Sequence, residues 1–358
     1  MRTKAFLLVI ATVFQAISCT AFLMNQGGRF YVGKNYDWQV ESGLIIQNKR
    51  NIEKTAFGVK NPAKWVSKYG SISFCQYGHD FPCGGMNEQG LVIEVLWLDE
   101  SVYEEKNSSE IDNMQWVQFQ LDNSATVSDV LLNDSLVCIR PISPTAVHYF
   151  VADKSGRAAV IEFINGEKKV YSHIDNSLMV PVLTNTPFDE SVQMIKQSKA
   201  FGGLLEVSEG EGSVSQFIRA GAMISETKVS EEPIDRAFSI LESSKISRLT
   251  AWSIVYDLEN SNIYYCTKSK KARKLISMKE INFDCSSPAY CIDIVNGYKG
   301  RIDKNFYQFT TDVNHENVSK AIKRTPFLKS MQNDFIRAIS YYPQEMKCAE
   351  GSLRPVVR

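Results

Sequence analysis

Cys19 is the residue whose type and position could carry covalent chemistry. It follows an apolar run over residues 5–14 and the small residues Ala16 and Ser18, a pattern typical of a cleaved secretory signal. Cleavage after Ser18 would give Cys19 a free thiol and a free α-amine. Such a thiol can attack an acyl carbon while the amine accepts its proton, directly or through a water molecule. Their ordinary pKa values, about 8.5 and about 7.7–8.0, are so close that the transfer needs no histidine.

The first 18 residues also predict where the mature protein is located. We expect residues 1–18 to be a signal peptide and the mature chain to be exported, periplasmic or secreted. A bacterial lipoprotein also has a cysteine at this place, but its signal usually carries Leu three residues earlier, where this chain has Ala16. A lipid-anchored, non-catalytic binding protein is therefore the alternative, because an acylated thiol cannot attack.

The residues after Cys19 predict a hairpin that returns toward it. Residues 21–24 and 29–33 have the pattern of two strands, and residues 25–28 form a turn signal. If that four-residue turn closes a simple hairpin, Cys19 lies opposite Lys34, and a register slip would move the partner by a residue or two. A cation at Lys34 would favour the thiolate. A carboxylate at Asp37 could accept a hydrogen bond from the α-ammonium and orient it.

Five short motifs follow one another in order after the predicted cut. They are Cys19-Thr20 with Gly33-Lys34-Asn35-Tyr36-Asp37-Trp38, Gly85-Met86-Asn87-Glu88-Gln89-Gly90-Leu91, Leu183-Thr184-Asn185-Thr186-Pro187, Phe217-Ile218-Arg219-Ala220, and Thr250-Ala251-Trp252-Ser253-Ile254-Val255-Tyr256-Asp257-Leu258. Together they resemble the choloylglycine hydrolases, the linear amide C–N hydrolase family that includes bile salt hydrolases and penicillin V acylases. The resemblance covers roughly residues 19–283 and does not obviously extend to the tail.

The resemblance implies an α+β fold, a four-layer αββα N-terminal nucleophile hydrolase sandwich with two antiparallel sheets. It implies Cys19 as the nucleophile and Asp37 as the group that holds its amine. Asn87 and Asn185 would form the oxyanion site, which stabilises charge developing on the carbonyl oxygen. Arg219 would support the charge balance around the thiol.

The implied activity is that of an exported cysteine amidohydrolase of the linear amide class. It would cleave a conjugated bile acid, a penicillin V-like amide or another N-acyl amide through a thioester at Cys19, with no cofactor and no metal. An acyltransferase, in which an amine instead of water intercepts the thioester, is a second alternative. The chain departs from the family at Lys34, where bile salt and penicillin V enzymes usually have Arg. The charge is kept and the planar fork of donors is lost, which bears on the choice of substrate more than on amide hydrolysis.

Four aromatic residues could line an apolar acyl site: Tyr36, Trp38, Trp97 and Trp116. Aromatic side chains at such spacings are more often part of a hydrophobic core. The four are nonetheless the residues that we expect to bind the substrate.

The remaining elements predict how such a site is positioned. Strand-like runs occur at residues 43–48, 70–76, 91–98, 147–153, 158–164, 178–184, 250–258 and 262–267, and helical patterns at residues 114–122, 126–132, 190–199, 213–225, 233–243 and 326–342. Adjacent strands and grouped helices favour antiparallel sheet with helices layered outside. We expect one domain over residues 19–295 and a C-terminal helical extension over residues 296–358. Its apolar stripe, Phe327, Met331, Phe335 and Ile339, predicts a helix docked on the body or, alternatively, one lying on a membrane surface.

The composition limits the partners. The 358 residues carry 40 Lys and Arg against 40 Asp and Glu, and this zero net charge argues against a general nucleic-acid binder. The expected partner is a small-molecule N-acyl amide substrate, with no stable membrane insertion after signal cleavage and a homo-oligomer expected from the family. The four histidines have no metal-ligand spacing. Of the eight cysteines, Cys75/Cys83 and Cys285/Cys291 are plausible short-loop disulfides in an oxidising compartment, although the sequence does not fix the pairing.

Overall fold

The structure of the protein, a computed structural model, describes residues 18–226 and 231–349. The predicted signal peptide lies outside the described residues, except for Ser18. The strands are β1 (Thr20–Gln26), β2 (Arg29–Asp37), β3 (Leu44–Asn48), β4 (Ile52–Thr55), β5 (Lys64–Val66), β6 (Ser71–Cys75), β7 (Pro82–Asn87), β8 (Val92–Trp97), β9 (Ser109–Ile111), β10 (Val137–Ile139), β11 (Val147–Ala152), β12 (Ala158–Ile164), β13 (Glu167–Ser172), β14 (Val182–Thr184), β15 (Thr250–Asp257), β16 (Asn262–Thr267), β17 (Lys274–Ser277), β18 (Tyr290–Asp293), β19 (Gly300–Arg301), β20 (Tyr307–Gln308) and β21 (Lys347–Cys348).

The helices are α1 (Asn113–Asn123), α2 (Val127–Asn133), α3 (Phe188–Gln197), α4 (Ser213–Ser225), α5 (Pro233–Ser243), α6 (Thr311–Arg324) and α7 (Asn333–Tyr341). Short 3₁₀ helices lie at η1 (Asp134–Leu136), η2 (Lys199–Phe201), η3 (Met278–Glu280), η4 (Asp303–Asn305), η5 (Pro326–Leu328) and η6 (Tyr342–Glu345).

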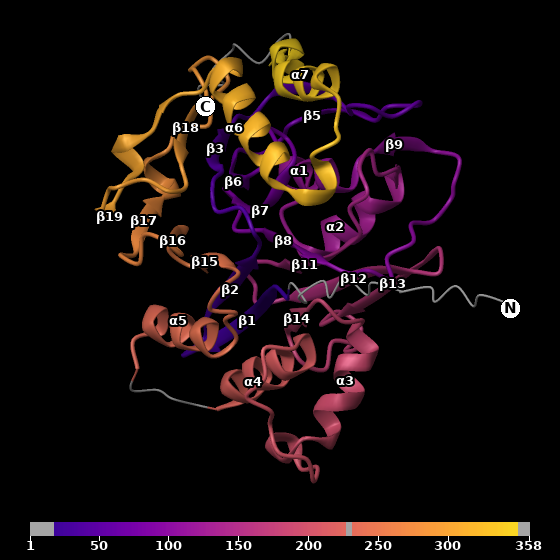
Figure 1. Ribbon diagram of the computed structural model, residues 1–358, viewed down its shortest axis with the longest axis vertical. Helices are drawn as coiled ribbons and strands as arrows, with labels where there is room; N and C mark the ends of the chain where they lie inside the picture. The colour runs from indigo at the N-terminus through magenta and orange to yellow at the C-terminus, as the bar shows by residue number, and fades with distance from the viewer. Residues whose placement is uncertain (1–17, 227–230, 350–358) are drawn as a thin grey trace, which may run out of the picture.

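Two large sheets form the centre of the molecule. One has the strand order β14-β1-β2-β15-β16-β17-β19 and the other β13-β12-β11-β8-β7-β6-β3-β18-β20, and within them only the β17–β19 pair is parallel. The main core lies between the sheets, with Trp252 and Tyr256 from the first sheet and Phe74 and Phe150 from the second. Helices α3, α4 and α5 cover the outer face of the first sheet, and α1 and α2 that of the second (Figure 1). This arrangement confirms the expected αββα sandwich.

The hairpin of β1 and β2 has a tighter turn than the sequence predicts. Gly27 and Gly28 form a two-residue turn with φ of +63° and +80°, the left-handed conformation that a hairpin of this length requires and glycine adopts without strain. Lys34 therefore pairs with Ala21 and not with Cys19. The correction is a shift of two residues, and a shift of two leaves every side chain on its original face of the sheet.

The disulfide prediction is wrong. Cys285 is bonded to Cys348, with 5.7 Å between their Cα atoms, while Cys75, Cys83 and Cys291 are free thiols. Cys75 packs in a cluster with Leu44 and Ile46, and Cys83 packs in the core between the sheets. The two residues thus point to opposite faces of the same sheet, where no disulfide can join them.

The C-terminal segment folds as two helices instead of the single helix predicted at residues 326–342. Helix α6 was not predicted, and Pro326 starts the short turn η5 between α6 and α7 because proline removes a backbone donor. The apolar stripe nonetheless docks on the body, where Phe327, Met331, Phe335 and Ile339 pack in one cluster with Phe81. The segment then returns as β21, which pairs with β4. In the described part of the chain, no helix combines the length and the apolar character that a membrane crossing needs.

Candidate active site

Cys19 lies directly before β1, between two neighbouring strands of the first sheet. Strand β14 pairs with β1 so that Thr184 is opposite Thr20, which places Asn185 opposite Cys19. The backbone N–H of Cys19 donates a hydrogen bond of 3.0 Å to Oδ1 of Asn185. Cys19 is buried, and its Sγ lies 3.9 Å from the backbone oxygen of Asp37 on β2. The register of three strands therefore brings together three of the residues predicted for the site.

The Asp37 carboxyl group is ready to accept a hydrogen bond. It lies at the end of β2, is fully buried, and neither of its oxygens has a hydrogen-bond partner among the described residues. Burial raises the pKa of Asp37 to about 7, although the nearby Thr250 hydroxyl and Lys34 offset part of the increase. A buried carboxylate without a partner is costly. An α-ammonium at Cys19 would supply the missing donors.

Lys34 lies beneath the site and not in solvent. Its side chain is wholly buried, its ammonium donates to the Val95 carbonyl oxygen at 2.5 Å, and it lies 3.9 Å from Oε2 of Glu94. The Tyr256 hydroxyl donates to Oε1 of Glu94 at 2.5 Å. Burial raises the pKa of Glu94 to about 7, while Lys34 and the Tyr256 hydroxyl lower it. Glu94 was not predicted from the sequence, although a single carboxylate in an otherwise apolar strand is a usable signal.

Burial dominates the electrostatics of the thiol. It raises the pKa of Cys19 to about 11, and the positive charge of Lys34 acts in the opposite direction, while Asp37 and Glu94 add to the increase. These shifts in the Cys19 pKa apply to the chain in which residues 1–18 are still attached. A free α-ammonium would add a second cation beside the sulfur, and a nearby cation favours the thiolate.

The Asn87 side chain is fully engaged in holding a turn. Its Nδ2 donates to the carbonyl oxygens of Leu121 and Ser124 at 2.9 and 2.7 Å, and its Oδ1 accepts from the backbone N–H groups of Gln89 and Leu91. It thereby ties the β7–β8 turn to the end of α1. Among the described residues no hydrogen bond joins Asn87 to Cys19, whereas Asn185 accepts one from the Cys19 backbone N–H.

Arg219 is also directed elsewhere. Its guanidinium donates to the backbone oxygens of Ser208, Gly210 and Ser243. The charged groups that act on the Cys19 thiol are Lys34, Asp37 and Glu94. These bonds tie α4 to the loop before it and to the end of α5.

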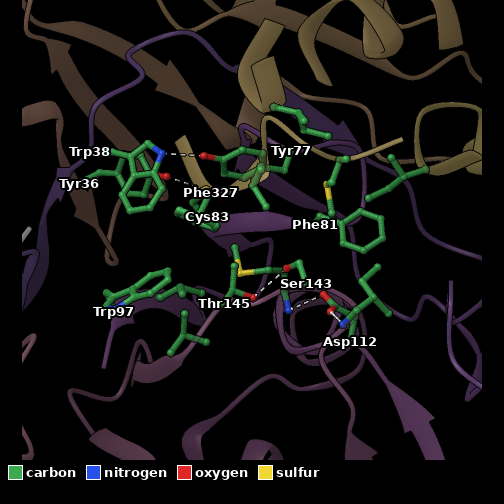
Figure 2. A pocket seen from close by; sticks show the side chains of 18 of the residues that line it. Tyr36, Trp38, Tyr77, Phe81, Cys83, Trp97, Asp112, Ser143, Thr145 and Phe327 are labelled. Carbon is green, nitrogen blue, oxygen red and sulfur yellow. Dashed lines mark hydrogen bonds between the residues drawn. The ribbon is translucent and has the colours of Figure 1, made fainter. Parts of the chain in front are cut away.

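An apolar pocket opens at Cys19. Tyr36, Trp38 and Trp97 line it, as predicted from sequence, and Figure 2 shows Trp38 and Trp97 at one side and Phe81 at the other. The Trp38 indole N–H donates to the Tyr77 hydroxyl at 2.6 Å, and the Tyr36 ring stacks on Trp252 with 4.4 Å between the centroids. Between the protein atoms the pocket holds about 840 Å³ of space, part of it open to solvent.

Trp116 does not line this pocket. It is wholly buried in the second core cluster, its ring centroid lies 4.3 Å from that of Tyr149, and its indole N–H donates to Asp134 at 2.9 Å. That cluster lies between the second sheet and helices α1 and α2. Trp116 was predicted to line the pocket but does not, because it lies on α1, on the outer side of the second sheet.

Sequence reasoning missed several further lining residues. Tyr77, Cys83 and Val95 come from the second sheet or the loop beside it, and Phe327 and Met331 come from the C-terminal segment. The apolar stripe of the extension was a visible signal, but the sequence did not show that it faces the site. Among the described residues, no group of three or more His, Cys, Asp or Glu is placed to hold a metal ion.

A double antiparallel sheet sandwiched by helices, with a cysteine at the start of its first strand, defines the N-terminal nucleophile hydrolase class of fold. The family of linear amide C–N hydrolases, choloylglycine hydrolase family, matches residues 19–291. The chain belongs to that family and is a hydrolase of carbon–nitrogen bonds in linear amides. The match begins at Cys19 and ends before the C-terminal extension.

Individual relatives agree with this assignment. The chain is 25% identical over 329 residues to a penicillin V acylase of Pectobacterium atrosepticum, covering 78% of this chain and 86% of the relative. Its structure is similar to that of penicillin V acylase from Agrobacterium tumefaciens, with a TM-score of 0.72, 24% identity, and coverage of 82% of this chain and 98% of the other. A mutant of conjugated bile acid hydrolase from Clostridium perfringens matches with a TM-score of 0.64, 21% identity, and coverage of 79% and 98%.

Proposed function

We propose that the protein is an exported cysteine amidohydrolase whose mature chain begins at Cys19. The observation that carries the proposal is the junction of three strands at this residue. The nitrogen that would become the α-amine lies 3.0 Å from Asn185. The Asp37 carboxyl group, whose charge acts on the Cys19 thiol, is buried and has no hydrogen-bond partner among the described residues. A free amine would satisfy that carboxyl group and serve as the base.

The first half of the reaction forms a thioester. The α-amine takes the thiol proton, Sγ attacks the acyl carbon, and the carbonyl oxygen becomes negative. The cation of Lys34, near the thiol, favours the sulfur anion. The C–N bond then breaks, and the α-ammonium returns its proton to the leaving amine. Every proton in this half is exchanged between the thiol, the α-amine and the substrate nitrogen.

The second half regenerates the thiol. The α-amine accepts a proton from water, the resulting hydroxide attacks the thioester carbon, and the carboxylic acid leaves as the ammonium returns its proton to sulfur. The substrates proposed are conjugated bile acids, penicillin V-like amides and other N-acyl amides, and the pocket at Cys19 takes the acyl part. The leader over residues 1–18 supports export to the periplasm or the medium, and a homo-oligomer is proposed from the family alone.

The test is turnover by the mature protein and by its Cys19→Ser variant, on a panel of N-acyl amides. A serine hydroxyl is far less ionised than a thiol near neutral pH, so we expect the variant to lose several orders of magnitude in kcat with an unchanged melting temperature. Activity of the variant above a few per cent of wild type would show that another group is the nucleophile. Product analysis with added amines distinguishes hydrolysis from acyl transfer, and the intact mass of the mature protein distinguishes a free Cys19 from a lipidated one.

A further inference from the structure

The pocket at Cys19 has a wall that the family match does not include. Six of its lining residues, Ile322, Phe327, Leu328, Met331, Phe335 and Ile339, come from α6, η5 and α7 and the residues between them, beyond residue 291 where that match ends. Other lining residues come from the second sheet, among them Cys83, Val95 and Trp97. Figure 1 shows α6 and α7, in yellow, in the upper part of the view, with β7 and β8 below them near the centre of the molecule.

This added wall is fixed to the body at both ends. The Thr325 hydroxyl lies 2.8 Å from that of Tyr77, which accepts the hydrogen bond of Trp38. Asn317 donates to the Gln76 carbonyl oxygen at 3.0 Å. After α7, β21 pairs with β4, and the disulfide of Cys348 with Cys285 closes the segment. The wall is therefore part of the site and not a loose flap.

Phe327 closes one side of the pocket. The centroid of its ring lies 6.1 Å from that of Trp38 and 5.8 Å from that of Trp97, and the centroids of the two indoles lie 6.0 Å apart. On the other side, the ring centroids of Phe335 and Phe57 lie 6.0 Å apart. Aromatic rings at these distances are in direct contact. The space between the two groups is bounded by hydrocarbon side chains from both walls.

The polar side chains in the lining already have partners. The Asp112 carboxylate accepts the backbone N–H groups of Met114 and Ile142, both at 2.9 Å. The Ser143 hydroxyl lies 3.1 Å from that of Thr145 (Figure 2), and Thr145 also accepts a hydrogen bond from Asn113. Among the described residues, every charged side chain in the pocket lining therefore has a hydrogen-bond partner. The pocket therefore suits an acyl group that carries no hydroxyl or charge of its own.

We propose that the C-terminal segment, residues 311–346, is the distal wall of the acyl pocket and selects amides with a long unbranched alkyl chain. This inference rests on the proposed function, since it names the substrate class for the same site. A hydroxylated steroid would leave its hydroxyl groups without partners against such walls. An alkyl chain gains affinity with each methylene that it buries, by about fourfold.

The first arm of the test measures hydrolysis. The mature protein is assayed with N-acyl p-nitroanilides from acetyl to dodecanoyl, with phenoxyacetyl and glycine-conjugated steroid amides beside them. We expect kcat/KM to increase about fourfold per methylene over several carbons. Met331→Trp fills the pocket, and Phe327→Ala removes one side of it. Both should lower the decanoyl-to-acetyl ratio of kcat/KM at least tenfold.

Matched controls separate the pocket from general effects of substitution. Met179 and Tyr298 are both 48% exposed and line no part of the pocket, so Met179→Trp and Tyr298→Ala should keep the wild-type ratio. Melting temperatures show whether each variant is folded. One variant fills the pocket and the other enlarges it, so if one of them does not fold, the other still tests the inference. A wild-type ratio in both folded pocket variants would overturn the inference, as would a preference for the steroid amides.

The second arm needs no catalysis. The Cys19→Ala protein is titrated with N-methyl alkanamides of increasing length, and the tryptophan fluorescence reports binding beside Trp38 and Trp97. We expect the Kd to fall about fourfold per methylene, and less steeply in Met331→Trp. Chain-dependent binding without hydrolysis by the wild type would contradict the proposed function and support the pocket. Hydrolysis of the phenoxyacetyl amide without any dependence on chain length would contradict the pocket alone.

Discussion

The ammonium of Lys34 and the carboxyl group of Glu94 lie 3.9 Å apart in the interior, where both side chains are almost completely shielded from solvent. A buried pair of this kind is a costly arrangement to keep unless it has a further use. Here both groups act on the Cys19 thiol, since Lys34 lowers its pKa and Glu94 raises it. The pair also has a steric requirement, because a Cβ atom at Gly84 would lie 2.2 Å from the Glu94 carboxylate.

The pair predicts opposite effects of two isosteric changes on the thiol. Lys34→Met removes the cation and should raise the pKa of Cys19 in the mature protein. Glu94→Gln removes an anion and should lower it. One pKa unit corresponds to about 1.4 kcal/mol, which a single nearby charge in a buried site can supply. The pH dependence of iodoacetamide alkylation of Cys19, followed by mass spectrometry, gives both midpoints. An unchanged midpoint in Lys34→Met would remove Lys34 from the site.

Glu94 also predicts how stability depends on pH. Because its pKa is raised to about 7, the folded state keeps a proton that the unfolded state releases above about pH 4.5. This contribution to the free energy of unfolding is complete below pH 4.5 and is lost as the pH increases through 7. Glu94→Gln should lack it, so its stability relative to wild type should increase over that range, by on the order of 3 kcal/mol at most. Urea unfolding at several pH values measures the difference, and a constant difference would contradict the assignment.

The two asparagines of the predicted oxyanion site should respond differently. Asn185 contacts Cys19, so Asn185→Ala should lower kcat by about 10²–10³-fold, the usual cost of an oxyanion donor. Asn87→Ala should instead leave buried groups without partners and cost about 1–3 kcal/mol of stability. Kinetics and thermal unfolding of both variants compare them directly. A large loss of kcat in well-folded Asn87→Ala would place that residue in the chemistry after all.

The cysteine pairing has a simple readout. One disulfide and six free thiols predict that denatured, unreduced protein takes up six alkyl groups, and eight after reduction. Peptide mapping should find Cys285 joined to Cys348. Uptake of four alkyl groups would instead support the two short-loop pairs expected from the sequence.

The sequence predicted the faces of the strands better than their partners. Cys19 and Lys34 share a face whether the hairpin turn has four residues or two, so their neighbourhood was predicted correctly despite an error in register. Asn87 and Asn185 could not be told apart, because each lies at the end of a strand and only the pairing of β14 with β1 decides which one meets Cys19. The stripe of Phe327 and Met331 predicted a docked segment, but periodicity does not say what a helix docks against. Long-range pairing was the missing information in each case.

The central claim is that Cys19 is the N-terminal nucleophile, and trapping the acyl-enzyme tests it most directly. The mature protein is mixed with excess substrate, quenched in acid within milliseconds, and its intact mass and N-terminal peptide are measured. We predict a chain that begins at Cys19 and gains the mass of one acyl group, held as a thioester on that residue and released by hydroxylamine. A chain that turns over substrate but begins at another residue, or that carries the acyl group elsewhere, would contradict the account.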